Sequence, residues 1–409
     1  MSSRGRQRWE QYTGCVLIAG LLLISTIGKS YYFQGHRRLW TLQMGGTALL
    51  VLVGLLHLAV CVPHLSKKQR LSMTPDPYVM GSLCLLLLSA SVSCAVQEQW
   101  HLNAAFLAVH AASIAILFVY GSYLVSTSGA SQFLDAVVVP IGIASLIGIA
   151  GYTGGLHWAR WYPGRLNGVF ANAIIAGQMS AVAALYFLWR ILYQPSCKPL
   201  LWRLLFLFAT AAVILTRTRT DIAGMCMGVS VCLLMIRRVK GSLFSPVGAR
   251  QFAVILVMAG VLLLLLQHLA ENVGSDAMRD YFRLEDDLTA TVSNRLPYWQ
   301  QGLARLSAGN MLGEGPLAKF GNDVSLAHSG YDRDSNTHNA FFSVIQYYGV
   351  SGGILYALFI ALLFRSLLNR KDPLGVLGMT ILAFGLVQSV SENWLLSFGT
   401  PSDLYSWLV

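Results

Sequence analysis

The sequence contains few charged residues. Only 11% of its 409 residues are Asp, Glu, Lys or Arg, whereas soluble domains average about 25%. Hydrophobic residues make up 55%, and they recur in runs close to the ~20 residues that a helix needs to cross a bilayer. The alternating ~10-residue segments that mark membrane β-barrels are missing. The sequence therefore predicts an all-α polytopic integral membrane protein.

Several common signatures of catalytic and metal sites are also missing. The seven cysteines form no Cys-x-x-Cys pair, and most lie within apolar runs, so neither a disulfide framework nor a zinc site is expected. No Gly-x-Ser-x-Gly turn or His-Glu-x-x-His helix occurs. The Asp-Arg-Asp triplet at 332–334 is short and common, and we expect neither a metal nor a cofactor. The net charge of +11 comes without a basic-aromatic patch, so we expect no nucleic-acid partner.

Hydropathy predicts about twelve transmembrane helices. The longest hydrophilic stretch, 270–336, is predicted to form an external loop that carries a short amphipathic helix. We treat 1–409 as one transmembrane domain that includes this loop. The predicted spans centre near residues 13–31, 41–63, 77–97, 101–125, 132–152, 170–193, 199–215, 221–236, 250–269, 337–364, 373–390 and 393–409.

The distribution of Lys and Arg predicts an orientation. More than half of the 29 basic residues fall in alternate short loops, which the positive-inside rule assigns to the cytoplasm together with both termini. This orientation leaves Arg160, Arg165, Arg217 and Arg219 in short external segments, where the rule disfavours them. An anionic ligand is the compensation that we expect.

The segment "RTRTD" at 217–221 is a candidate phosphate-binding element. A planar guanidinium donates two parallel hydrogen bonds to a phosphate, so Arg217 and Arg219 suit this role. The alternative is that both side chains reach towards lipid headgroups from a helix end. In this alternative, Asp221 pairs with Arg219 and caps the following helix.

Two further candidates lie near the long external loop. Arg295 begins the amphipathic helix, and His338 with Asn339 begins the span near 337–364. A histidine titrates near neutral pH, so His338 is a candidate general base. The alternative interpretations are a solvated charge for Arg295 and a helix cap for His338.

The order of these elements resembles the O-antigen ligase and polymerase superfamily. An arginine-led helix at Arg295, a Gly-x-Gly turn in "MLGEGPLAKF" and a His-Asn pair in "THNAFFSVIQYYGVSGG" follow one another as in that family. Upstream, "ILTRTRTD" resembles its Thr-x-Ser/Thr-Arg element, with Arg219 at the matching position. The segment "RLNGVFANA" resembles a third element, Arg-x-x-Gly-x-Phe-x-Asn, at Arg165, Gly168, Phe170 and Asn172. After the Asn of this element many members have proline, whereas this sequence has Ala173.

The resemblance implies a GT-C-like, membrane-embedded glycosyltransferase in the inner membrane of a Gram-negative bacterium, surrounded by membrane lipids. Its donor would be O-antigen linked to undecaprenyl diphosphate, and its acceptor a terminal sugar of lipid A-core on the periplasmic face. Transfer would be inverting and metal-independent. The roles implied are base for His338, diphosphate binding for Arg219 and Arg295 and more weakly for Arg217 and Arg165, and support for Asn339 and Asn172.

Other functions stay open on the sequence. Within the same superfamily, an O-antigen polymerase or a protein O-oligosaccharyltransferase shares these elements. Outside it, a lipid-linked glycan transporter or a membrane scaffold is the alternative. The candidate site residues of this chain gather at the external edges of the spans, and the middle of the spans is nearly free of charge, whereas transporters place charges near the bilayer midplane.

Overall fold

The computed structural model describes residues 76–98, 130–160, 164–170, 172–193, 199–240, 311–315 and 339–391, with isolated residues within 49–56, 100–115 and 299–307. In these ranges the regular secondary structure is helical, apart from one isolated bridge between Arg160 and Leu166. Six helices of the described ranges are long and apolar enough to cross a membrane. The chain is thus helical and polytopic, as predicted, whereas the number of about twelve spans stays a prediction.

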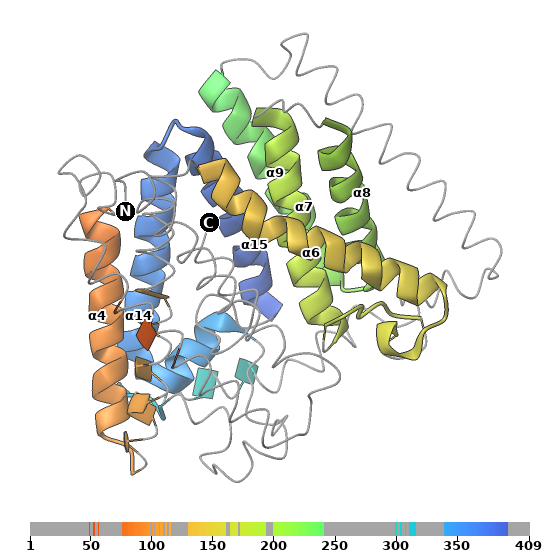
Figure 1. The fold of residues 1–409 in the computed structure, drawn as a ribbon. Helices are drawn as coiled ribbons and strands as arrows, with labels where there is room; N and C mark the ends of the chain where they lie inside the picture. Colours follow the sequence, from red (N-terminus) through yellow and green to blue (C-terminus); the bar gives the residue numbers. More distant parts are fainter. Residues whose placement is uncertain are drawn as a thin grey trace. The chain divides into compact units, whose positions relative to one another are not determined.

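The helices agree with the predicted spans to within a few residues. The spans predicted near 13–31, 41–63, 101–125, 250–269 and 393–409 lie wholly or largely outside the described residues. The helices are α4 (Pro77–Ala95), α6 (Ala130–Thr153), α7 (Ala173–Tyr193), α8 (Pro199–Leu215), α9 (Arg219–Lys240), α14 (Ala340–Asn369) and α15 (Pro373–Ser391), which Figure 1 labels.

Contacts divide the chain into two compact units. Unit 1 comprises Met1–Val137, Tyr298–Asn369 and Ser389–Val409, and unit 2 comprises Val138–Pro297 and Arg370–Gln388. Most of the 270–336 loop lies outside the described residues, so the single domain with its external loop stays a prediction.

Asp-Pro pairs start one helix in each unit. The Asp76 carboxylate accepts a hydrogen bond of 2.9 Å from the Tyr78 N–H, and Asp372 accepts one of 2.8 Å from the Gly375 N–H. The proline that follows each aspartate has its φ preset for the first helical turn. The starts of α4 and α15 are therefore encoded locally. Hydrogen bonds from Ser366 and from the Tyr78 N–H also hold the pKa of Asp76 below its usual value.

In unit 1, α4 packs against α14 through small polar side chains. The hydroxyls of Ser89 and Ser351 lie 3.2 Å apart, and that of Ser93 donates to the Tyr347 carbonyl at 2.7 Å. The two ribbons run side by side in Figure 1. A mostly apolar groove of about 230 Å³ lies between α4 and the described residues of 100–111.

The helix α14 breaks at Gly349, and the predicted Gly-x-Gly turn lies against the break. Gly349 has φ 74° and ψ −175°, which no helix interior tolerates. The N–H groups of Glu314 and Gly315 donate to the carbonyls of Gln346 and Tyr347, at 2.8 and 2.9 Å. The turn thereby supplies donors to carbonyls in the helical turn before the break.

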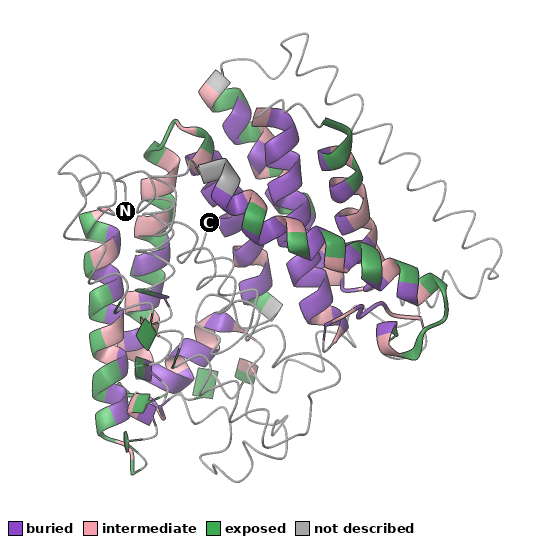
Figure 2. Cartoon of the chain, viewed as in Figure 1, coloured by how far each residue is buried: buried purple, intermediate pink, exposed green. Residues whose placement is uncertain are grey.

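In unit 2, α7 is the central helix. In its most apolar 18-residue stretch, 94% of the residues are buried. Figure 2 shows burial along almost the whole length of the helix. It packs against α8 and α9. A Cβ added at Gly142 of α6 would lie 2.9 Å from the Phe187 ring and 3.1 Å from Leu205, so a glycine lets α6 approach α7 and α8 closely.

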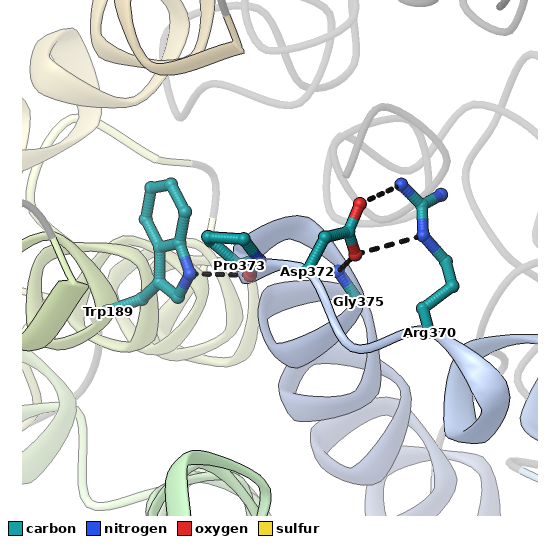
Figure 3. Close-up of polar contacts among 5 residues, drawn as sticks. All are labelled: Trp189, Arg370, Asp372, Pro373 and Gly375. Carbon is teal, nitrogen blue, oxygen red and sulfur yellow. Dashed lines mark hydrogen bonds and ion pairs between the residues drawn. The ribbon is translucent and has the colours of Figure 1, made fainter. Parts of the chain in front are cut away.

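The two ends of α7 have different surroundings. At its C-terminal end, the Trp189 indole donates to the Pro373 carbonyl at 2.7 Å, and Arg370 pairs with Asp372 nearby (Figure 3). Its N-terminal end follows the segment with Arg165. With 21 residues, α7 is about 30 Å long, which matches the hydrocarbon thickness of a bilayer.

Candidate functional site

A tight turn between α8 and α9 carries two of the predicted arginines. α8 ends at Leu215 and α9 begins at Arg219, so three residues join the helices; we call residues 216–219 the arginine turn. Arg217 has φ 55°, the one positive φ at a non-glycine residue among the described residues. This left-handed conformation costs about 1–2 kcal/mol for a residue with a side chain. Such strain persists where the surroundings fix the backbone, and it is frequent at functional sites.

Threonine hydroxyls fix the backbone of the arginine turn. Thr216 Oγ1 donates to the Val213 carbonyl at 2.6 Å and lies 2.8 Å from Thr218 Oγ1. Thr218 in turn donates to the carboxylate of Asp221. Thr218 and Asp221 occupy the N-cap and N3 positions of α9, where a hydroxyl and an acid stabilise a helix start. Asp221 thus lies in the first turn of α9 and accepts a hydrogen bond from the side chain of its N-cap residue.

A second segment, far away in the sequence, contacts the same turn. The Leu166 N–H donates to the Leu215 carbonyl at 2.9 Å, and Arg165 Nε donates to the Thr216 carbonyl at 3.0 Å. Gly164, with φ 84°, lies so close to Arg217 that an added Cβ would be 2.9 Å from its Nη1. The structure thus brings Arg165 to the turn that carries Arg217, although Arg165 and Thr216 are 51 positions apart in the sequence.

Amide side chains hold this second segment. Asn167, fully buried, donates from Nδ2 to the carbonyls of Trp158 and Phe170, both at 3.2 Å. Asn172 Oδ1 accepts from the Ile175 N–H at 2.9 Å and so caps the start of α7. Asn172, predicted to support the site, therefore fixes the helix that follows Arg165.

A buried polar chain extends from the arginine turn into the helices of unit 2. Asp221 Oδ1 accepts from Gln388 Nε2 of α15 at 2.8 Å, and Gln388 Oε1 accepts from Gln178 Nε2 of α7 at 3.3 Å. These three residues are 1%, 0% and 5% exposed. Sequence reasoning missed both glutamines, although single amides within apolar runs are a recognisable signal.

The predicted site residues are distributed as follows. Arg165, Arg217 and Arg219 are half-buried at one end of unit 2. Arg295 and His338 lie outside the described residues. In the part of the chain that the structure describes, no three His, Cys, Asp or Glu residues are grouped so as to hold a metal ion.

Asn339 of unit 1 has a structural role next to His338. Its Oδ1 accepts from the N–H groups of Phe341 and Phe342 at 3.0 and 3.2 Å, and so caps α14. Its Nδ2 donates to the Val390 carbonyl at 3.1 Å. Both the oxygen and the nitrogen of the Asn339 side-chain amide, directly after His338 in the chain, are therefore held by hydrogen bonds.

Comparison with known proteins gives a match to one family model over part of the chain. Residues 204–357 match the family model described as O-antigen ligase. The matched segment includes the arginine turn, α9, the Gly-x-Gly turn and the His338–Asn339 pair. This match agrees with the resemblance that the sequence elements carry. No curated protein matches the chain.

Proposed function

We propose that this member of the O-antigen ligase family transfers O-antigen from undecaprenyl diphosphate to a terminal sugar of lipid A-core. The family match supports a ligase or a polymerase-like function in general. The observation that carries the finer proposal is the meeting of Arg165 and Arg217 at the strained α8–α9 turn that also includes Arg219.

The arginine turn has the chemistry of a diphosphate site. Its two arginine residues are half-buried, and hydrogen bonds between ionised groups strengthen as water is excluded. Glycine would adopt the backbone conformation of Arg217 at lower cost. We therefore assign the Arg217 side chain a role in binding that accounts for the arginine at this strained position. Arg295 is the further cation that we assign to the leaving group.

The reaction that we propose uses His338 as a general base. The oxygen of the acceptor hydroxyl attacks the anomeric carbon of the donor sugar while His338 takes the hydroxyl proton. The bond between that carbon and the diphosphate oxygen breaks, and the diphosphate leaves with the electron pair. Arginine side chains stabilise the charge that develops on it, without a metal ion.

The proposed orientation places the arginine turn on the periplasmic side. The arginine turn lies at the opposite end of α7, α8 and α9 from Arg190, Arg203, Arg237 and Arg238. The positive-inside rule assigns the latter end to the cytoplasm. Both termini then lie in the cytoplasm, and the resemblance to the O-antigen ligase family implies the inner membrane of a Gram-negative bacterium as the location. The apolar groove beside α4 suits a lipid tail.

Reconstitution tests the proposed reaction. The purified protein is placed in liposomes with undecaprenyl-diphosphate O-antigen and rough lipopolysaccharide, with EDTA present, and the products are separated by size. We expect lipopolysaccharide that carries O-antigen. Longer lipid-linked glycan without modified lipopolysaccharide would instead assign the chain to the polymerase branch.

Two histidine variants give the matched comparison. His338→Ala should abolish transfer without changing expression or membrane insertion. His157→Ala removes an exposed histidine of the short helix His157–Ala159 and should leave transfer intact. Near-normal transfer by the His338→Ala protein would refute the role as base.

A further inference from the structure

Asp221 is an acidic residue that the proposed reaction does not use. It is 1% exposed in the apolar interior of unit 2, where an ionisable side chain is costly unless hydrogen bonds compensate. Its two carboxylate oxygens accept from different elements, Oδ2 from Thr218 of the arginine turn and Oδ1 from Gln388 of α15. The carboxylate therefore connects the turn to α15.

The surroundings of Asp221 pack closely around its carboxylate. A Cβ added at Gly177 of α7 would lie 2.0 Å from Asp221 Oδ2 and 2.6 Å from Thr218 Oγ1. The carboxylate and the hydroxyl are thus pressed against the backbone of α7. Gln388 is fixed in turn by Gln178 of α7. Helices α7 and α15 together define where the carboxylate lies.

From Asp221 the connection continues to the arginines. Thr218, which donates to Asp221, lies 2.8 Å from the hydroxyl of Thr216, and the carbonyl of Thr216 accepts from Arg165 Nε at 3.0 Å. Arg217 lies between the two threonines in the strained conformation. Removal of the Asp221 carboxylate would leave Thr218, and through it the arginine turn, without its connection to Gln388 of α15.

We infer that Asp221, held by Gln388, is the positioning residue that keeps Arg165 and Arg217 in the geometry required to bind a diphosphate. The consequence for the donor rests on the proposed function. The effect on the turn does not, because it follows from the contacts that Asp221 makes with Thr218 and Gln388 and from the packing of Thr218 against Thr216.

Two substitutions of Asp221 separate its hydrogen bonds from its charge. In Asp221→Ala, Thr218 and Gln388 lose this acceptor. In Asp221→Asn, the amide oxygen still accepts from Thr218, while the amide nitrogen donates to Gln388 after both glutamines have turned their amides over. The Asn variant therefore preserves the series of hydrogen bonds without the negative charge.

Hydrogen exchange of the full-length protein in detergent micelles tests the positioning directly. Exchange is followed in the peptides that contain residues 164–168 and 212–219, whose N–H groups hold the turn. Asp221→Ala should accelerate exchange in both peptides by about tenfold, because local opening becomes easier. Asp221→Asn should stay within about threefold of the natural protein.

Thr380→Val is the control for a lost buried hydroxyl on α15. Thr380 is fully buried and donates within its own helix, to the Val376 carbonyl at 2.7 Å. This variant should leave both peptides unchanged. Unchanged exchange in Asp221→Ala, or equal acceleration in Thr380→Val, would overturn the inference.

The kinetics show whether positioning serves the donor. In the reconstituted reaction, Asp221→Ala should raise the KM for the lipid-linked donor about tenfold and leave the KM for the acceptor unchanged, with recovery in Asp221→Asn. Equal changes in both KM values would overturn the assignment to the diphosphate. If the natural protein transfers no glycan while exchange responds as expected, the proposed function fails and the positioning of the turn stands.

Discussion

Substitution of Arg217 separates the strain of the arginine turn from its use. Arg217→Gly and Arg217→Ala both remove the guanidinium, but only glycine adopts φ 55° without a steric cost. The penalty for a side chain in this conformation is about 1–2 kcal/mol. Against it stands about 0.5–1 kcal/mol for the greater freedom of glycine in the unfolded chain.

The Gly variant should therefore be more stable than the Ala variant by about 0.75 kcal/mol, a difference that corresponds to about 1.5–3 °C in the melting temperature of a domain of 150–250 residues. Thermal unfolding of both variants in the same detergent, followed by intrinsic Trp fluorescence, measures the difference. The comparison cancels the loss of contact between the guanidinium and Gly164, which both variants share.

Both variants should bind a short polyprenyl diphosphate at least about tenfold more weakly than the natural protein, since a hydrogen bond to a charged group contributes about 1.5–3 kcal/mol. Equal melting temperatures for Gly and Ala would refute the reasoning about strain. A Gly variant that melts higher and binds as tightly as the natural protein would refute the functional value of the side chain.

Three other substitutions test particular contacts. Gly177→Ala places a methyl group 2.0 Å from Asp221 Oδ2, so it should displace the carboxylate and lower both donor binding and the melting temperature. Gly313→Ala adds a Cβ 2.4 Å from the Gly349 nitrogen at φ 75°, and it should cost at least about 1–2 kcal/mol, measured by thermal unfolding. Burial raises the pKa of Asp372, but hydrogen bonds from Arg370 and Gly375 outweigh this effect and lower it below 3.8. Its stabilising contribution is therefore complete above pH 3.8 and is lost as the pH falls through the lower folded value, so the melting temperatures of Asp372→Asn and the natural protein should converge at low pH.

The spans could be predicted because their signal is local. The run 77–97 is apolar and begins with an Asp-Pro pair that caps a helix, and the structure has α4 at Pro77–Ala95. The run 373–390 begins in the same way and forms α15. Length, hydropathy and capping each depend on neighbouring residues alone, so their prediction needs no tertiary information.

The geometry of the site depends on tertiary contacts and could be predicted only in part. The sequence indicated Arg165 and Arg217 separately, but nothing in their spacing shows that the Arg165 side chain reaches the Thr216 carbonyl. The break of α14 at Gly349 was not predicted, since an isolated glycine in an apolar run is compatible with a continuous helix. The partnership of Asp221 with Gln388 requires the packing of α9 against α15, which periodicity does not encode.

The most direct test of the central claim is the affinity of the purified protein for two lipids that differ by one phosphate. Binding of a short polyprenyl diphosphate and of the corresponding monophosphate is measured for the natural protein and for Arg219→Lys, with EDTA present. We predict that the natural protein prefers the diphosphate by about tenfold or more and that the lysine variant loses this preference, because an ammonium lacks the paired donors of a guanidinium. Equal affinity of the natural protein for the two lipids would contradict the assignment of the arginine turn to the donor diphosphate.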